Sequence, residues 1–392
     1  MKIVYLLPGG LFNSGGMERV ITVKANYLTD NMDYDVSIIT TEQMGRPIYY
    51  PLSEQVHLYH LNIGIHEKFG RESYIEKCFS RIFKTRKYKK ALRTVLAEIR
   101  PDIIISTLGG LDIGFLNSIQ KDSIKFGELH FPGNYRQLMA RKLSNAFIPN
   151  FVAKIRTWTF KRQCEILDRL IVLTKEEKSF WKDQQSVDVI PNPISFLPSE
   201  LSSLCSKKAI AVGRLAYEKG FDLLIEAWKG VASKHPDWEL HIYGNGNQKD
   251  HLLRIIRDNC LEQQIKIHEP VKDIEEKYLD SSLFILPSRY LEALPMVMLE
   301  AMACGLPLVA FDAPCGPKDI ITEGENGFLI TVGDIHSLTE KINRLIESEE
   351  FRQKMGKASK QRSADYQVEI IMKLWDDLFQ NEYKVHKRNV YI

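Results

Sequence analysis

The sequence predicts an α/β protein built from two doubly wound domains, and three observations support this. The chain has 392 residues, which is too long for one ordinary hydrophobic core. Short apolar runs alternate with helix-length segments, as expected for parallel strands joined by helices. This alternation stops in a Pro- and Ser-rich stretch and then restarts. We therefore expect one domain over 1–190, a linker over 191–208, a second domain over 209–367 and a final helical segment over 368–392.

The clearest single unit covers residues 283–311. Apolar runs of strand length stand at both ends, and a helix-length segment beginning near Pro295 lies between them. Gly305 and Pro307 follow that segment, which is the usual order of residues at the end of a helix. The pattern predicts strand, loop, buried helix and strand, which together form one βαβ unit.

Two carboxylates stand out in this unit, Glu292 in the loop and Glu300 inside the helix. A carboxylate in an apolar helix is costly to bury unless it is hydrogen-bonded. The N-terminal end of the same helix offers free backbone amides, which favour a phosphate group. A ligand carrying phosphate and several hydroxyl groups would satisfy both features. The alternative is a buried helix whose two acids are merely solvated or ion-paired.

Glycine-rich loops follow three of the predicted strands. The first strand precedes Gly15 and Gly16, the strand at 209–212 precedes Gly213, and the strand at 240–243 precedes Gly244 and Asn245. Glycine allows backbone amides to approach a phosphate closely. The first loop lacks the G-x-G-x-x-G spacing of a dinucleotide site. These loops therefore favour a phosphate-bearing ligand without identifying it.

Two further polar positions lie beside predicted strands. His130 directly follows the strand predicted over 125–129, at the carboxyl end where open α/β sheets carry their binding sites. Asp33-Tyr34-Asp35 has the D-x-D spacing of acidic residues that can hold a metal ion, but it precedes a strand and so lies at the opposite edge. We expect His130 to be functional and the acidic pair to form a solvated turn.

These motifs resemble a known family. Glu292 and Glu300, separated by seven residues and followed by Ala-Met-Ala-Cys-Gly-Leu-Pro, are similar to the paired-glutamate motif of the retaining glycosyltransferases of family four. The likeness continues in order along nearly the whole chain. It implies the GT-B fold, in which two Rossmann-like domains face a cleft and the last helix crosses back to the N-terminal domain. Val368–Phe379, with Trp375, is the predicted crossing segment.

The resemblance also implies roles for individual residues. His130 would face the transferred sugar, Arg214 and Lys219 would converge on the donor diphosphate, and Glu292 would hold sugar hydroxyls. The donor-binding set, in which Glu300 holds the ribose, is Gly15, Gly16, Gly213, Gly244, Asn245, Ala293, Leu294, Pro295, Met296 and Glu300.

Some details of this region remain open. A surface ion pair between Lys219 and Glu218 is the alternative role for that lysine, and Asp222 is expected to cap the helix that follows. The chain has Glu292-Ala293-Leu294-Pro295 where the family often has Glu-Gly-Phe-Gly, so the sugar that is bound is not defined by the resemblance.

The expected activity is transfer of a hexose or N-acetylhexosamine from a nucleotide sugar with retention of the anomeric configuration. The expected donor is a UDP-linked sugar. The acceptor would be a glycan or a lipid-linked saccharide of surface polysaccharide or lipopolysaccharide synthesis. Arg214 and Lys219 would offset the charge of the leaving diphosphate, so no metal and no cofactor are expected. The alternatives are a nucleotide-sugar epimerase and a non-catalytic two-lobed sugar-binding protein.

Charge is distributed unevenly along the chain. Residues 68–162 contain 20 Lys and Arg against 7 Asp and Glu, whereas the whole chain has a net charge of +3. No nucleic-acid-binding motif accompanies this stretch, and aromatic residues lie between the basic ones. An anionic membrane surface is therefore the expected partner, with a solvated helix face as the alternative. The candidate contacts are Lys84, Arg86, Lys87, Lys89 and Lys90.

The remaining features concern location. The N-terminal apolar run is too short for a signal peptide, and no segment has the length of a spanning helix. The six cysteines have no ligand-type spacing and are expected to be reduced thiols. We expect a cytoplasmic protein bound peripherally to the inner face of the cell membrane.

Overall fold

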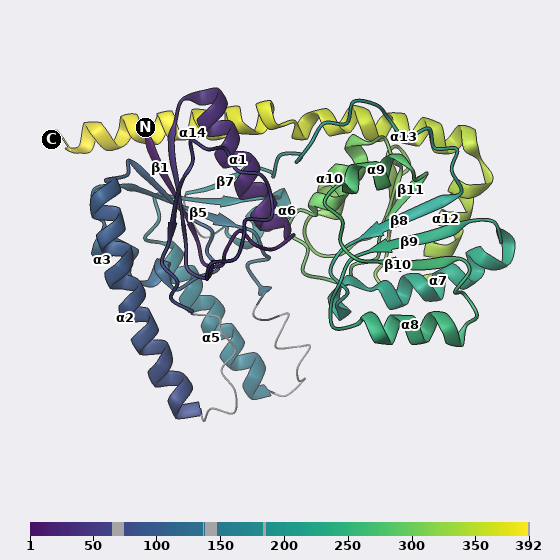
Figure 1. The fold of residues 1–392 in the computed structure, drawn as a ribbon, viewed down its shortest axis with the longest axis horizontal. Coiled ribbons are helices and arrows are strands. Elements are labelled where there is room, and N and C mark those ends of the chain that lie inside the picture. Colours follow the sequence, from purple (N-terminus) through teal and green to yellow (C-terminus); the bar gives the residue numbers. More distant parts are fainter. Residues whose placement is uncertain (65–73, 136, 138–146, 183–185, 391–392) are drawn as a thin grey trace. The chain divides into compact units, whose positions relative to one another are not determined.

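The structure is a computed structural model and describes residues 1–64, 74–135, 137, 147–182 and 186–390. The chain divides into two units (Figure 1): unit 1 comprises Met1–Pro193 and Val368–Ile392, and unit 2 comprises Ile194–Gln367. Most of the segment predicted as a linker is therefore part of unit 2. Hydrogen bonds hold it there, because Ser202 Oγ donates to the Ser281 carbonyl and Arg352 Nε donates to the Leu204 carbonyl.

The described part of unit 1 is built on a seven-stranded parallel sheet with the order β3-β2-β1-β4-β5-β6-β7. Its central strands are continuous runs of Ile, Val and Leu, as expected when helices cover both faces of a sheet. In the register, Ile3 lies opposite Val36 on one side and Ile103 on the other. The strands are β1 (Lys2–Leu7), β2 (Asp35–Thr40), β3 (His57–His60), β4 (Ile103–Ser106), β5 (Ile124–Leu129), β6 (Arg169–Val172) and β7 (Val187–Val189).

Helices from both ends of the sequence pack on this sheet. The helices of unit 1 are α1 (Gly16–Met32), α2 (Tyr74–Ile99), α3 (Leu116–Ile119), α5 (Phe147–Cys164), α6 (Lys175–Phe180) and α14 (Val368–Val390). The last of these buries Trp375 and Phe379 in the core of unit 1, and Phe379 stacks on Phe126 of β5 with ring centroids 5.7 Å apart. Helix α14 continues through residues 384–388.

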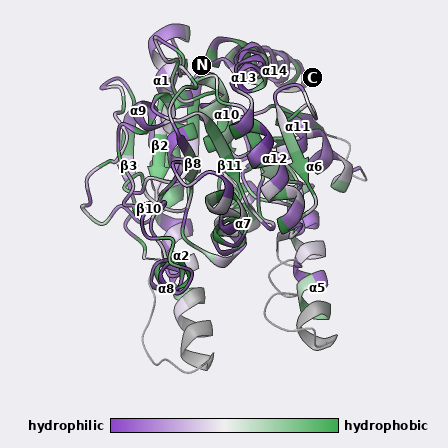
Figure 2. Ribbon diagram, turned by 90° about the vertical axis from the view of Figure 1, so that its right-hand side faces the viewer, coloured by the Kyte–Doolittle hydropathy of each residue, from purple (hydrophilic) through white to green (hydrophobic). Residues whose placement is uncertain are grey.

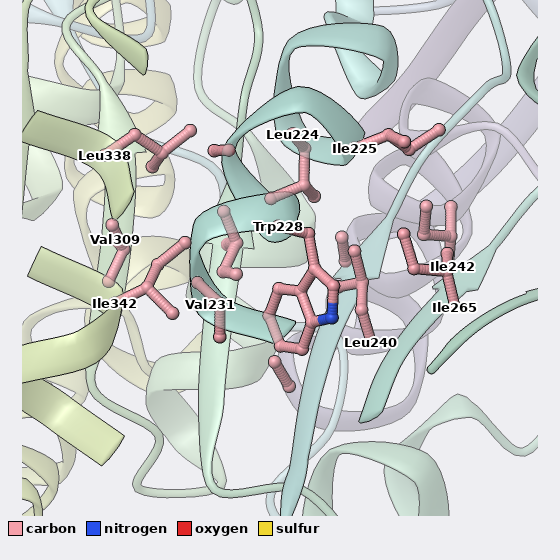
Figure 3. Packing of buried hydrophobic residues seen from close by; sticks show 14 of the residues in the cluster. Leu224, Ile225, Trp228, Val231, Leu240, Ile242, Ile265, Val309, Leu338 and Ile342 are labelled. Atoms are coloured by element: carbon pink, nitrogen blue, oxygen red, sulfur yellow. The ribbon is translucent and has the colours of Figure 1, made fainter. Parts of the chain in front are cut away.

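The described part of unit 2 has a six-stranded parallel sheet with the order β10-β9-β8-β11-β12-β13. Trp228 of α7 is fully buried against this sheet among aliphatic side chains (Figure 3). The strands are β8 (Lys208–Val212), β9 (Glu239–Tyr243), β10 (Ile265–His268), β11 (Leu283–Leu286), β12 (Leu308–Phe311) and β13 (Gly327–Ile330).

The helices of unit 2 complete its two outer layers. They are α7 (Phe221–Lys234), α8 (Lys249–Asp258), α9 (Ile274–Leu279), α10 (Met296–Ala303), α11 (Pro317–Ile320), α12 (Ile335–Glu347) and α13 (Glu349–Ser363). Strands such as β11 are hydrophobic (Figure 2). Within the described residues, no helix combines the length and the apolar composition needed to cross a membrane.

Candidate active site

Two loops of unit 2 meet through a short ion pair. Lys219 lies in the loop between β8 and α7, and its Nζ is 2.6 Å from Glu292 Oε1 in the loop after β11. The lysine side chain is 22% exposed and the glutamate side chain 5% exposed. Ser288 Oγ donates to the same carboxylate oxygen. Lys219 therefore pairs with a residue of the other predicted motif and not with Glu218, the surface partner considered as the alternative.

Arg289 fastens the same two loops together. Its guanidinium donates to both carboxylate oxygens of Asp222, over 2.7 and 2.6 Å, and to the backbone carbonyl of Tyr217 over 2.7 Å. It also lies 4.3 Å from the centroid of the Tyr217 ring. Burial alone would raise the pKa of Asp222, but the hydrogen bonds and the charge of Arg289 outweigh burial and lower it. A bidentate pair of this kind fixes geometry as well as charge.

Asp222 consequently does not have its predicted role. Helix α7 has Gly220 as its N-cap, with no side-chain cap, and the carboxylate of Asp222 is held by Arg289. Gly220 has φ +68°, and a Cβ there would lie 2.0 Å from the backbone oxygen of Pro287. Only glycine fits where the two loops approach so closely.

Glu300 lies on α10 and is buried, with 1% of the residue exposed. Its carboxylate accepts hydrogen bonds from Ser195 Oγ over 2.8 Å and from the Tyr278 hydroxyl over 3.2 Å. Both of these donors are hydroxyl groups. The requirement that a buried carboxylate be hydrogen-bonded is met here by partners that the sequence did not indicate.

The start of α10 follows directly after Glu292. Helix α10 begins at Met296, with Pro295 as its N-cap and no side-chain cap. Leu294, Pro295 and Met296 are buried, and Ala293 is half-buried. These residues can contact a ligand mainly through backbone groups, and Pro295 has no N–H to offer. Gly316 packs closely against this loop, since a Cβ at that position would lie 2.7 Å from Pro295 Cδ.

The Gly-rich loops after β8 and β9 lie against each other. A Cβ on Gly244 would lie 1.9 Å from the backbone oxygen of Gly213, and Leu215 N donates to the Asn245 carbonyl over 2.7 Å. The structure thus brings together three of the predicted donor-binding residues. Arg214 is separate from the Lys219–Glu292 contact: its side chain is 66% exposed, and Nη2 lies 2.6 Å from Glu218 Oε1.

In unit 1, the structure places His130 beside the first Gly-rich loop. Its side chain is 6% exposed, and Nε2 lies 3.3 Å from Glu128 Oε1. Gly15 is the N-cap of α1, and Gly16 is its first residue. Glu18 folds back over this turn, since a Cβ on Gly15 would lie 2.2 Å from Glu18 Oε2. Burial raises the pKa of Glu18, and Asn13 and His130 partly offset this effect.

Metal-ligating residues do not converge in the part of the chain that the structure describes, where no group of three or more His, Cys, Asp or Glu could hold an ion. Asp33 ends α1 in the left-handed conformation, and Asp35 is the first residue of β2. Both are exposed. Asp35 lies 3.9 Å from Lys2 Nζ and 3.7 Å from His57 Nε2, which are weak surface contacts.

Sequence reasoning missed several residues around these sites. They are the hydroxyl donors to the two glutamates, the Arg289–Asp222 pair, and a buried Lys24–Glu128 pair in unit 1. A usable signal existed for Glu128, since it is a charged residue inside a strand that otherwise reads as buried. The Ser288–Glu292 hydrogen bond spans only four residues. The remaining contacts join segments far apart in the sequence, which no local pattern reveals.

Comparison with known proteins adds relatives that align along nearly the whole chain. Residues 199–362 match the family model described as glycosyl transferases group 1. An uncharacterized glycosyltransferase of Haemophilus influenzae is 29% identical over 380 residues, covering 96% of this chain and 99% of the relative. The amylovoran biosynthesis glycosyltransferase AmsD of Erwinia amylovora is 29% identical over 389 residues, with coverage of 96% and 99%. An N-acetyl-D-galactosaminyltransferase of Campylobacter jejuni, named for a diphosphoundecaprenol-linked saccharide, is 24% identical, with coverage of 96% and 97%.

Solved structures resemble the whole chain as well. A TarM variant of S. aureus in complex with fondaparinux, alpha-GlcNAc-glycerol and UDP has a TM-score of 0.74 at 18% identity, with 96% of this chain and 99% of that chain covered. HepE of Anabaena in complex with UDP and glucose has a TM-score of 0.69 at 18% identity, with coverage of 96% and 99%. At this level of identity, the likeness concerns the fold.

Proposed function

Residues 199–362 belong to the glycosyl transferases group 1 family on a GT-B fold, and from this premise we propose a specific reaction. The chain moves a hexose or N-acetylhexosamine, with retention of the anomeric configuration, from a UDP-linked donor to a glycan or lipid-linked saccharide. The observation that carries the proposal is the junction of the two unit 2 loops, where Lys219 contacts Glu292 at 2.6 Å. At this junction, the cation proposed to neutralise the diphosphate, Lys219, contacts the carboxylate proposed to bind the sugar, Glu292.

In this reaction the bond between the sugar's anomeric carbon and the diphosphate oxygen breaks, and a bond to the acceptor hydroxyl oxygen forms on the same face. The proton of that hydroxyl passes to the departing diphosphate. Lys219 and Arg214 stabilise the negative charge that builds on the departing diphosphate. Glu292 holds sugar hydroxyls and Glu300 holds the ribose. His130 contacts the transferred sugar. Positioning and charge stabilisation then account for the rate without a protein nucleophile.

Two substitutions test these roles. Lys219→Ala and Glu300→Gln should each leave a folded protein and reduce transfer at saturating donor, since losing one charged contact of this type costs about 2–4 kcal/mol, or roughly 30- to 1000-fold in rate. The measurement is sugar transfer from a panel of nucleotide sugars, with release of free nucleotide followed in parallel. Near-normal turnover in either variant would remove that residue from the site. Binding of the donor without turnover in the wild type would favour the alternative of a non-catalytic sugar-binding protein.

Metal independence belongs to the same proposal, because cationic side chains act on the diphosphate. Activity should therefore survive excess EDTA. Loss of activity on chelation, restored by Mg²⁺ or Mn²⁺, would show that a metal ion is required. Asp33 and Asp35 would then be the first candidates for its ligands.

A membrane-facing surface completes the proposed function, because the acceptor class includes lipid-linked saccharides. Helices α2 and α5 extend from the same side of unit 1 (Figures 1 and 2). On α5, Phe151, Ile155 and Trp158 follow one another at helical spacing on one face and are 53%, 47% and 61% exposed. On α2, Phe83 is 70% exposed.

Basic residues accompany this apolar surface. On α2, Arg86, Lys87 and Lys90 are exposed. The predicted contacts Lys84 and Lys89 are half-buried, and Lys84 donates to the Gly64 carbonyl. Exposed aromatic and aliphatic groups beside cations suit the boundary of an anionic bilayer. Parts of the predicted basic stretch over 68–162, at 68–73, 136 and 138–146, lie outside the described residues. We assign the protein to the inner face of the cell membrane as a peripheral enzyme.

A further inference from the structure

A charged pair is buried beneath the carboxyl end of β5. Lys24 of α1 places its Nζ 2.7 Å from each carboxylate oxygen of Glu128, and both side chains are 1% exposed. The ammonium group also lies 3.7 Å from the ring centroid of Trp375 on α14 and 5.5 Å from that of Tyr5 on β1. Three separate elements therefore enclose a single lysine.

The carboxylate of this pair is ionised. Burial alone would raise the pKa of Glu128, but the charge of Lys24 and the neighbouring His130 outweigh burial and hold that pKa at about 2. Burial lowers the pKa of Lys24, and its bonds to Glu128 counteract this effect. An ammonium nitrogen at equal distance from both oxygens is the arrangement expected of a charged donor and a charged acceptor.

Stability does not account for such a pair. Removing two charges from water is costly, and replacing a buried ion pair by apolar side chains of similar volume is often neutral or stabilises a protein by about 1–4 kcal/mol. The core around Lys24 already contains large apolar groups, including Phe126 and Phe379. An apolar pair would fit this environment, so the charges point to a role outside the stability of unit 1.

The role is indicated by what lies next along the strand. Glu128 and His130 are two residues apart, and side chains with this spacing leave an extended chain on the same face. His130 Nε2 lies 3.3 Å from Glu128 Oε1. The distance is in the ion-pair range, and among the described residues the buried Nε2 makes no hydrogen bond to any other group. Lys24 thus fixes the carboxylate that faces the imidazole.

We propose that Lys24 and Glu128 are positioning residues for His130, holding the hydrogen on Nε2 so that Nδ1 is left as the acceptor for a donor-sugar hydroxyl. This rests on the proposed function, in which His130 contacts the transferred sugar. In an imidazole that carries one hydrogen, the nitrogen hydrogen-bonded to a carboxylate is the one that keeps it. Neither Lys24 nor Glu128 touches the sugar.

Glu18 is the competing partner of the imidazole. It lies in the first turn of α1, and its electrostatic interaction with His130 partly offsets the effect of burial on the pKa of Glu18. If Glu18 and not Glu128 orients the ring, the Lys24–Glu128 pair is dispensable for catalysis. The experiment must therefore separate the two carboxylates.

Two double variants isolate the hydrogen-bond acceptor from the charges. Lys24→Met/Glu128→Gln and Lys24→Met/Glu128→Leu both remove the ion pair, but only the first keeps an oxygen beside His130. Single substitutions are avoided because they leave an unpaired buried charge. Should the Leu variant fail to fold, Lys24→Met/Glu128→Met supplies a more adaptable apolar side chain. Arg169→Met/Glu382→Leu removes another ion pair that joins α14 to the sheet, with a distance of 2.7 Å, and serves as the control.

Steady-state transfer is the first readout. The Leu variant should lose about 10- to 100-fold in kcat, as when a carboxylate that orients a catalytic or ligating histidine is removed, with the donor KM little changed. The Gln variant should retain most of the wild-type rate, and the control should match the wild type. Equal rates in the Gln and Leu variants would overturn the proposal.

Nitrogen-15 NMR of the histidine rings is the second readout and needs no turnover. His130→Asn identifies the signal of His130. The Nε2–H tautomer should dominate in the wild type and in the Gln variant, and a mixture should appear in the Leu variant. An unchanged tautomer in the Leu variant would mean that Glu18, and not Glu128, orients the His130 ring. A wild type that holds this tautomer but transfers no sugar would refute the proposed function and leave the positioning of His130 standing.

Discussion

At the scale of the residue, the two glutamates of the unit 2 site are held in different ways. Glu292 contacts an ammonium group and a serine hydroxyl, whereas Glu300 accepts hydrogen bonds from the hydroxyls of Ser195 and Tyr278. A carboxylate beside a cation is fixed in charge and place. A carboxylate held by hydroxyls can exchange them for the hydroxyls of a sugar. The two environments fit the proposed division between sugar and ribose.

Cysteine reactivity gives a prediction at the same scale. Burial, with smaller contributions from Glu275 and Glu300, raises the pKa of Cys304 to about 12, so the thiol stays protonated at pH 8 and does not act as a nucleophile. Cys205 and Cys260 are exposed. Brief alkylation of the native protein at pH 8, read out by peptide mass spectrometry, should modify these two and spare Cys304. Labelling of Cys304 at a comparable rate would contradict its burial beside α10.

At the scale of the element, close approach between loops makes the unit 2 site sensitive to a single Cβ. Gly220→Ala places a methyl group against the backbone oxygen of Pro287, in addition to the strain of φ +68°. Gly324 has a similar φ of +78° but open space around the added Cβ. Gly324→Ala should therefore cost only the conformational term, about 1 kcal/mol.

The expected result is that Gly220→Ala lowers the free energy of unfolding clearly more than Gly324→Ala, and that it alone impairs transfer. Urea titration and transfer assays on both variants give the comparison. Equal effects of the two substitutions would mean that the loops can separate without loss, and that the contact between Gly220 and Pro287 does not shape the site.

The final helix offers a second test for an element. Trp375 is fully buried in the core of unit 1, with its ring beside Lys24 Nζ, whereas Leu374, one residue earlier, is 43% exposed. Trp375→Ala should destabilise the protein by about 3–5 kcal/mol, and Leu374→Ala should stay within about 0.5 kcal/mol of the wild type. Thermal unfolding of the two variants decides this. Similar melting temperatures would mean that α14 is not an integral part of unit 1.

At the scale of the whole molecule, the uneven charge predicts salt-dependent attachment to anionic membranes. Each cation near such a surface contributes about 1 kcal/mol, so changing Arg86, Lys87 and Lys90 to Glu should weaken binding by about 100-fold or more. Flotation with vesicles containing phosphatidylglycerol measures this at low and high salt. The matched control changes Arg254, Arg257 and Lys357 of unit 2 to Glu. These three residues are also exposed, and the change in net charge is the same.

Three outcomes would count against membrane attachment. The wild type could stay with the soluble fraction at low salt, both triple variants could float as well as the wild type, or they could lose binding equally. A separate variant, Phe83→Ser/Trp158→Ser, tests the apolar part of the surface. It should weaken flotation at high salt, where charge attraction is screened.

The sequence by itself indicated the alternation of strands and helices, the two-domain organisation and the places of the glycine loops and paired glutamates. It did not indicate β3 (His57–His60), a short strand of exposed and half-buried residues. Hydrophobic periodicity and helix punctuation are local properties, so they can be seen in a short window. The unit around Pro295 shows this, because α10 begins one residue after it. The resemblance to the retaining glycosyltransferases of family four also came from short motifs in a fixed order, and residues 199–362 match the glycosyl transferases group 1 model.

Only the tertiary structure decided which charged groups meet. Arg289 and Asp222 are 67 residues apart, and Lys24 and Glu128 are 104 apart. The expectation that Asp222 caps its own helix was wrong because a partner from another loop reaches it. Such pairs depend on which strands become neighbours in the sheet and on which helix covers each face. These arrangements minimise the free energy of the whole chain, so no local stretch of sequence encodes them.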